Sequence, residues 1–155
     1  MKQSFFSLFF LSVFLLIVGL TGSLGAQNFD GVVQFDVGLA GLDSRAQVES
    51  AAQDGRIVIL EGLMGDAVVE ENGRGVWVSL IGGSWVSSDE VRAYGCMVHF
   101  KGTRFAEVFP GVVPKDPSPD YVPQGSRLLI AAQILRFDEV LGMARAEMVD
   151  YRVLD

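Results

Sequence analysis

The chain has one histidine and one cysteine, and these two residues lie three positions apart. Any site built on imidazole must use His99, and any thiol nucleophile must be Cys96. Both fall in an alternating apolar segment that predicts a β-strand, in which positions i and i+3 point to opposite faces. We therefore expect His99 to be a partly exposed or hydrogen-bonded strand histidine. Cys96 is expected to be a buried thiol, with an intermolecular disulfide as the alternative.

Two other segments carry groups that could do chemistry. Gly82-Gly83-Ser84-Trp85 lacks the Gly-x-Ser-x-Gly spacing of a nucleophile turn and is expected to be a loop. Oxygen-bearing side chains cluster between Asp66 and Asn72, but their spacing is not that of a calcium loop. The sequence therefore predicts no catalytic residue, no metal site and no cofactor.

The first 26 residues have the parts of a secretory signal peptide. Lys2 precedes the apolar run Phe5–Leu20, and small residues follow up to Ala26. Cleavage fits after Gly25 or after Ala26. We expect a bacterial protein that is exported to the periplasm or secreted, or one tethered to the membrane if the segment is not cleaved.

Residues 27–155 are enough for one domain with a core of its own. The whole chain has a net charge of −7, and the loss of Lys2 would leave 11 basic residues against 19 acidic ones. Such an acidic surface repels nucleic-acid phosphates and anionic lipid. With one cysteine, the exported domain has no internal disulfide and must be stabilised by its core.

A short extension, residues 27–54, comes before the main domain. It contains a possible strand at Gly31–Val37 and a short helix at Ser44–Ala52, with Ser44 as N-cap and Gln47 at capping-box spacing. Asp54-Gly55 ends this helix.

Residues 55–155 are dominated by a period of two, which predicts strands. Five are expected, at 56–64 (with a continuation through 69), 76–81, 91–100, 127–137 and 144–154. Asn72-Gly73 predicts a hairpin turn after the first, and Gly82-Gly83 is expected to end the second. Gly62 and Gly95 predict bulges or tight bends of a barrel.

The segment between the third and fourth strands is irregular. Gly102–Phe109 predicts a short helix, and all five prolines follow in the loop 110–123. We interpret this loop as a stiff surface segment that crosses the barrel end. The alternative is a docking segment that displays Phe109 and Tyr121 to a partner.

Three strands, a short helix and two strands are the order of the OB-fold, a five-stranded Greek-key barrel. Similar segments are GRIVILEG at 55–62, GVWVSL at 75–80 and GSRLLI at 125–130. On these segments the chain resembles exported bacterial OB-fold proteins, more specifically domains of the tRNA-anticodon-binding type. The resemblance implies an all-β fold, an OB-fold barrel with an N-terminal strand-and-helix extension and a short helix between strands three and four.

OB-folds bind ligands across the second and third strands, between the loop after the first strand and the loop after the fourth. The resemblance thus implies a ligand surface, with Val78 and Leu80 pointing to the core. Its expected members are Trp77, Ser79, Trp85, Arg92, Tyr94 and Phe137.

Our main expectation is a non-enzymatic exported module that binds protein, peptide or glycan in the cell envelope. The alternative is binding of single-stranded nucleic acid or tRNA, helped by a basic cluster of Arg92, Lys101 and Arg104. An uncharacterised envelope enzyme is the third hypothesis.

Overall fold

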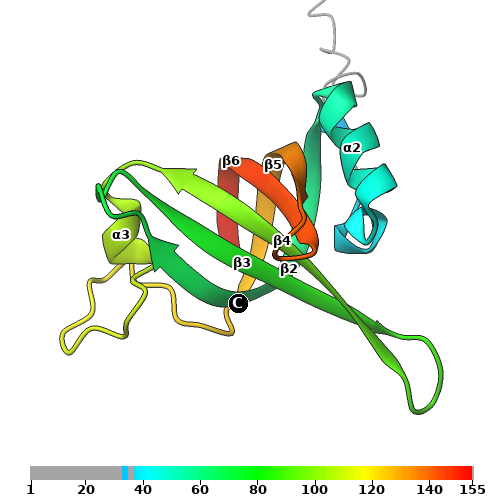
Figure 1. Cartoon of the computed structure of the whole chain (residues 1–155). Helices are drawn as coiled ribbons and strands as arrows, with labels where there is room; N and C mark the ends of the chain where they lie inside the picture. Colours follow the sequence, from blue (N-terminus) through cyan, green and yellow to red (C-terminus); the bar gives the residue numbers. More distant parts are fainter. Residues whose placement is uncertain (1–32, 35–36, 155) are drawn as a thin grey trace, which may run out of the picture.

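Five long strands form a closed barrel in the computed structural model, which describes residues 33–34 and 37–154. They are β2 (Ile57–Val69), β3 (Gly75–Trp85), β4 (Val91–Lys101), β5 (Arg127–Asp138) and β6 (Met143–Leu154). Around the barrel the order is β2-β3-β4-β6-β5, and β5 pairs back onto β2 (Figure 1). Within this ring only β4 and β6 are parallel. This is the five-stranded OB-fold barrel that the strand order predicts.

β2 closes the barrel because it serves two neighbours. Residues from Ile57 to Leu63 pair with β5, and residues from Leu63 to Val69 pair with β3. Gly62 lies at this bend, where a Cβ atom would be 2.8 Å from the carbonyl oxygen of Ile81. The register irregularity of β2 comes slightly later, between Met64 and Ala67. Neither Gly62 nor Gly95 is itself a bulge, so that part of the expectation is wrong.

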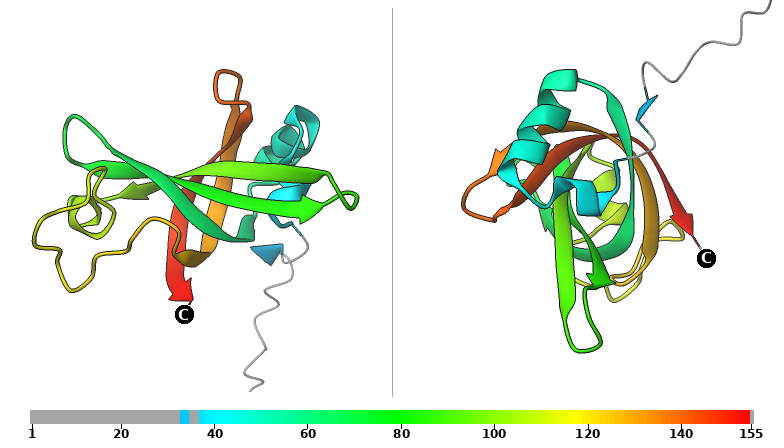
Figure 2. Two further views of the ribbon diagram at one scale, coloured as in Figure 1. Left: turned by 90° about the horizontal axis from the view of Figure 1, so that it is seen from below. Right: turned by 90° about the vertical axis from the view of Figure 1, so that its right-hand side faces the viewer.

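The β3–β4 hairpin is longer than predicted and projects from the barrel as a two-stranded arm (Figures 1 and 2). β3 does not end at Gly82-Gly83, because each residue up to Trp85 has a partner on β4. β2 pairs with β3 only as far as Ile81, and β6 pairs with β4 only from Cys96 onward. In the described part of the chain, the ladder beyond those points therefore joins β3 and β4 alone.

The N-terminal elements pack beside the barrel. They are β1 (Val33–Gln34), the 3-10 helix η2 (Leu39–Leu42) and α2 (Arg45–Asp54). Ser44 caps α2 by accepting a hydrogen bond from the Gln47 amide, and Gly55 ends it in the left-handed conformation, as predicted. α2 lies against β5 (Figure 1).

Several N-terminal predictions fall outside the described residues. These include the signal segment 1–26 and most of the expected strand at Gly31–Val37, of which Val33–Gln34 is strand. No helix among the residues that the structure describes is long and apolar enough to cross a membrane.

The core fills the barrel with residues that alternate along each strand. Val76, Val78 and Leu80 on β3 are fully buried, as the alternation predicts. α3 (Phe105–Val108), shorter than the predicted helix, brings Phe105 and Phe109 against Phe100 of β4, with ring centroids 5.4 and 4.7 Å away. Phe109 is 0% exposed, so the expectation that it is displayed to a partner is wrong. Burial of its ring in this aromatic cluster stabilises the fold, whereas exposure to water would lose that stabilisation.

Candidate functional site

A groove of about 490 Å³ lies on the outer face of β3 and β4, with walls from β2 and β6. It forms because alternate residues of β3 point away from the core, and because the β5–β6 loop folds toward the same face. The lining residues are Asp66, Val68, Trp77, Ser79, Leu80, Ile81, Gly95, Met97, Leu141, Met143 and Arg145. Most are apolar, and Asp66 and Arg145 are the charged ones.

Trp77 is the aromatic residue of the groove and is held in place by two neighbours. His99, opposite it on β4, stacks on the indole with 4.5 Å between ring centroids and 15° between planes. The guanidinium of Arg145 lies 4.7 Å from the indole centroid. Both reach Trp77 from β4 and β6, on one side of β3, whereas Val68 of β2 pairs with it on the other. The half-buried indole is thus fixed in orientation and still partly exposed.

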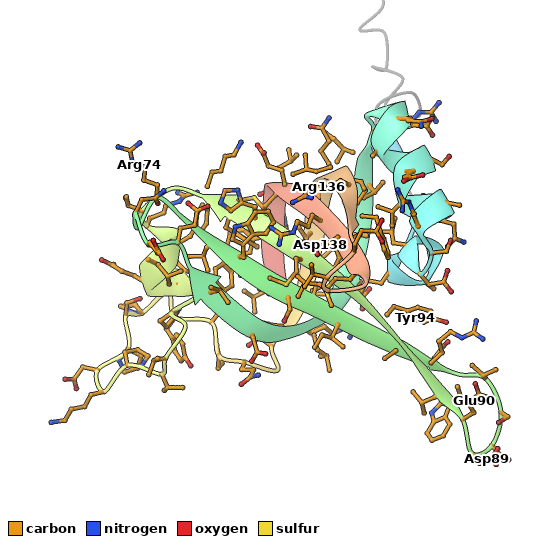
Figure 3. The ribbon with its side chains drawn as sticks, viewed as in Figure 1. Arg74, Asp89, Glu90, Tyr94, Arg136 and Asp138 are labelled. Atoms are coloured by element: carbon orange, nitrogen blue, oxygen red, sulfur yellow. The ribbon has the colours of Figure 1, made fainter. Side chains whose placement is uncertain are left out.

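The buried carboxylate of Asp138 fixes the orientation of the Arg145 side chain. Its side chain is 8% exposed, and its Oδ2 accepts a hydrogen bond of 2.5 Å from Arg145 Nε. Its Oδ1 accepts from the amides of Val140 and Leu141, each at 3.0 Å. These hydrogen bonds, that from Leu141 most strongly, lower the pKa of Asp138 from its ordinary value although burial opposes them. One carboxylate therefore fixes both the β5–β6 loop and the arginine over Trp77, and Figure 3 shows it at the centre of the view.

His99, the ring stacked on Trp77, lies close to Gly75 and Glu70. His99 Nε2 is 3.1 Å from Glu70 Oε1, but the alignment is not that of a hydrogen bond, and this buried nitrogen has no hydrogen-bond partner in the part of the chain that the structure describes. A Cβ on Gly75 would lie 2.4 Å from the same nitrogen. His99 can thus stack on Trp77 because residue 75 is glycine and has no Cβ in its way.

Basic residues do not form the predicted cluster. Arg92 and Lys101 stand at opposite ends of β4, opposite Ser84 and Gly75 of β3. Arg104 lies over the Phe105 ring, 4.6 Å from its centroid, beside α3. The expectation of one cluster is therefore wrong, because an 11-residue strand separates two of its members by about 30 Å.

Lys101 and Arg74 are two basic residues at the end of the β3–β4 ladder that carries Gly75, beyond His99 and Trp77. The Gly102 amide donates to the Arg74 carbonyl at 2.7 Å, which brings the two segments together. Lys101 Nζ is 2.6 Å from Glu147 Oε2, so part of its charge is compensated. Arg74 is exposed at the end of the barrel in Figure 3.

The structure brings only two of the predicted ligand residues, Trp77 and Ser79, into the groove. Trp85 lies on the arm and is 73% exposed. The Tyr94 hydroxyl is 2.8 Å from Ser84 Oγ, on the arm close to the barrel (Figure 3). Arg92 is 4.0 Å from Asp43, and Phe137 packs against the core.

Tyr121, predicted for partner docking, lines a second cavity beneath the proline-rich loop. This cavity, also about 490 Å³, lies between α3, the loop and the end of β6, where Tyr151 forms part of its wall. Phe109 does not line it.

Sequence reasoning considered Asp66 only as a possible calcium ligand, and it missed Met97, Met143 and Arg145. Met97 pairs with Ser79 because the β3–β4 hairpin turns between Trp85 and Val91. The sequence did not reveal where this turn lies. Arg145 comes into place through the parallel pairing of β4 with β6, which joins segments far apart in the chain. No local signal encodes that pairing.

No group of His, Cys, Asp and Glu side chains suited to a metal ion occurs among the described residues. Cys96 is 0% exposed and burial raises its pKa to about 12, which makes it a poor nucleophile. Its side chain points inward while His99 points outward, as the strand spacing predicts.

No protein-family model matches the sequence, and no curated protein matches it. Among solved structures, a small single-stranded DNA binding protein from Mycoplasma pneumoniae is similar at 10% identity and TM-score 0.38, over 64% of this chain and 84% of that one. A protein described as a putative aspartyl-tRNA synthetase from Leishmania major Friedlin is similar at 8% identity and TM-score 0.44. The match covers 82% of this chain but 24% of that one. The structure of yeast Stn1 and Ten1 is similar at 13% identity and TM-score 0.35, over 80% of this chain and 79% of that one.

These likenesses correct our main functional expectation. A single-stranded DNA binding protein and an aspartyl-tRNA synthetase are among the structures that the chain resembles. The expectation of a module that binds protein, peptide or glycan in the cell envelope is therefore wrong, both as a function and as a class of partner.

Proposed function

We propose that this chain binds single-stranded nucleic acid across the outer face of β3 and β4, with Trp77 as the platform on which a base stacks. The observation that carries the proposal is the indole itself. It lies in an apolar groove, supported by His99 and Arg145 and partly exposed. Because every base has a π-face, stacking on such a platform contributes affinity that by itself depends little on sequence.

The groove suits a base better than a phosphate. Arg145 is its only basic lining residue, and that guanidinium is already paired with the buried carboxylate of Asp138. The other lining groups include Val68, Met97 and Met143, which offer apolar surface. A base inserted here would bury its ring faces while its sugar and phosphate stayed outside the groove.

Trp77 and Trp85 provide a matched pair for the test, because they are the only tryptophans and only the first lines the groove. Binding of a fluorescein-labelled, mixed-sequence 12-nucleotide single strand to the full chain would be followed by anisotropy at low salt. We expect Trp77→Ala to weaken binding by at least about fivefold, the lower end of what one base–aromatic stack contributes. Trp85→Ala should change binding by less than about twofold.

The same titration reports where the binding energy comes from. On this proposal Arg74 and Lys101, beyond Trp77 on the β3–β4 hairpin, are the two side chains that neutralise phosphates, so the slope of log K against log salt should be no steeper than about −1.4. No binding by the wild type, or equal binding by the two tryptophan variants, would refute the proposal. Circular dichroism of each variant would establish that it is folded.

We further propose that binding takes place outside the cytoplasm, on nucleic acid that is free in the envelope or the medium. The support is the sequence of residues 1–26, which has the order of a bacterial export signal. Cell fractionation, with sequencing of the N-terminus of the protein recovered, tests this location. A protein that starts at Met1 in the cytoplasmic fraction would contradict it.

A further inference from the structure

The groove contains a second charged group, Asp66, which the stacking proposal does not use. Its Oδ1 accepts a hydrogen bond from the neutral amide of Gln124 at 3.2 Å. No cation of the described residues lies within salt-bridge distance of it, whereas the other charge of the groove, Arg145, is paired with Asp138. Asp66 therefore presents an exposed carboxylate with acceptor capacity left over.

The bulge in β2 places the backbone of Asp66 beside Ser79, and Asp66 and Trp77 both line the groove. The register of β2 shifts between Met64 and Ala67, and the backbone carbonyl of Asp66 then accepts a hydrogen bond from Ser79 Oγ at 3.2 Å. Ser79 is two residues from Trp77 on the same face of β3, which is a separation of about 7 Å. The width of a base stacked on Trp77 is comparable with that separation, so an edge of the base comes within reach of Asp66.

We propose that Asp66 reads the edge of the stacked base and selects bases that carry an exocyclic amine over those that carry a carbonyl at the same position. An amine N–H donates to a carboxylate, as cytosine N4 does to aspartate in groove recognition. The 4-oxo group of uracil or thymine has only lone pairs to offer and is repelled. This inference rests on the proposed function, because it concerns the base that stacks on Trp77.

Cytosine and uracil are a suitable pair for the test, because in deoxyuridine the amine at position 4 is replaced by oxygen, while the adjacent N3 carries a hydrogen that cytosine lacks. Anisotropy titrations of the full chain would compare labelled dC and dU octamers at one salt concentration. We expect the dC octamer to bind about tenfold more tightly, within the range measured for a good base-edge contact.

Asp66→Asn should reduce the dC-to-dU ratio to less than about twofold. An amide can accept from cytosine or donate to uracil, so it distinguishes neither. Loss of one negative charge also raises the affinity for every oligonucleotide, which is why the ratio is the readout. Asp150→Asn removes the same charge from β6, outside the groove, and should leave the ratio at about ten.

Two results would overturn the inference and one would remove its basis. If the wild type binds both octamers equally, or if the preference survives in Asp66→Asn, base selection by Asp66 is wrong although binding on Trp77 stands. If neither octamer binds, and the mixed-sequence strand does not bind either, the proposed function itself fails.

Discussion

Replacement of Gly75 by alanine tests the geometry under the Trp77 platform. The added Cβ would lie 2.4 Å from His99 Nε2, a separation that real Cβ atoms do not show, and 3.2 Å from the carbonyl oxygen of Phe100. His99 cannot turn away freely, because its ring is stacked on Trp77 at 4.5 Å. The substitution should therefore strain the stack.

Two opposing contributions set the magnitude. Overpacking of a well-packed site costs about 1–3 kcal/mol. Alanine in an extended strand regains about 0.5–1 kcal/mol relative to glycine, through the unfolded chain. We expect a net destabilisation of about 1–2 kcal/mol for Gly75→Ala in urea unfolding followed by tryptophan fluorescence.

A double-mutant cycle with His99→Ala isolates the cause. Without the imidazole, Gly75→Ala should be neutral or stabilising by up to about 1 kcal/mol, which gives a coupling free energy of about 1–3 kcal/mol between the two positions. Gly38→Ala is the matched control, because its backbone is also extended and its Cβ would meet nothing within 4 Å. If Gly75→Ala costs the same with and without His99, the argument that glycine is needed to seat the histidine is wrong.

Three further predictions follow from buried groups. Leu80→Ala should lower the free energy of unfolding by about 2–5 kcal/mol in urea, because its side chain is 0% exposed; a loss below 1 kcal/mol would contradict its place in the core. Because the pKa of Asp138 is lowered in the folded state, its contribution to stability is complete above the ordinary carboxyl value of 3.8 and is lost as the pH falls through the lower, folded value. In thermal melts from pH 7 to pH 2, the Tm of Asp138→Asn should thus decrease less on acidification than the Tm of the wild type. An equal decrease of Tm in both proteins would refute this. Cys96, with a pKa of about 12, should react with a thiol reagent such as Ellman's only after unfolding in urea, so prompt labelling of the native protein would show that it is accessible.

Local patterns in the sequence predict most of the barrel, because strands, caps and turns depend on neighbouring residues. The alternation at Val76, Val78 and Leu80 identifies the inner face of β3, and therefore places Trp77 on the outer face. The Ser44 cap and the Gly55 terminus of α2 are also encoded locally. β3 continues past the predicted end at Gly82-Gly83, because pairing with β4 outweighs the low strand propensity of these two glycines.

The sequence by itself determined the fold class, the buried cysteine and the side of β3 on which a ligand surface can lie. Only the tertiary structure decided which residues surround Trp77. Arg145 reaches it through a parallel strand pair, His99 through a hairpin register set at Trp85 and Val91, and Asp66 through a bulge in β2. Each of these contacts depends on how the barrel closes. That closure is a long-range property, since it brings together segments whose pairing no local pattern specifies.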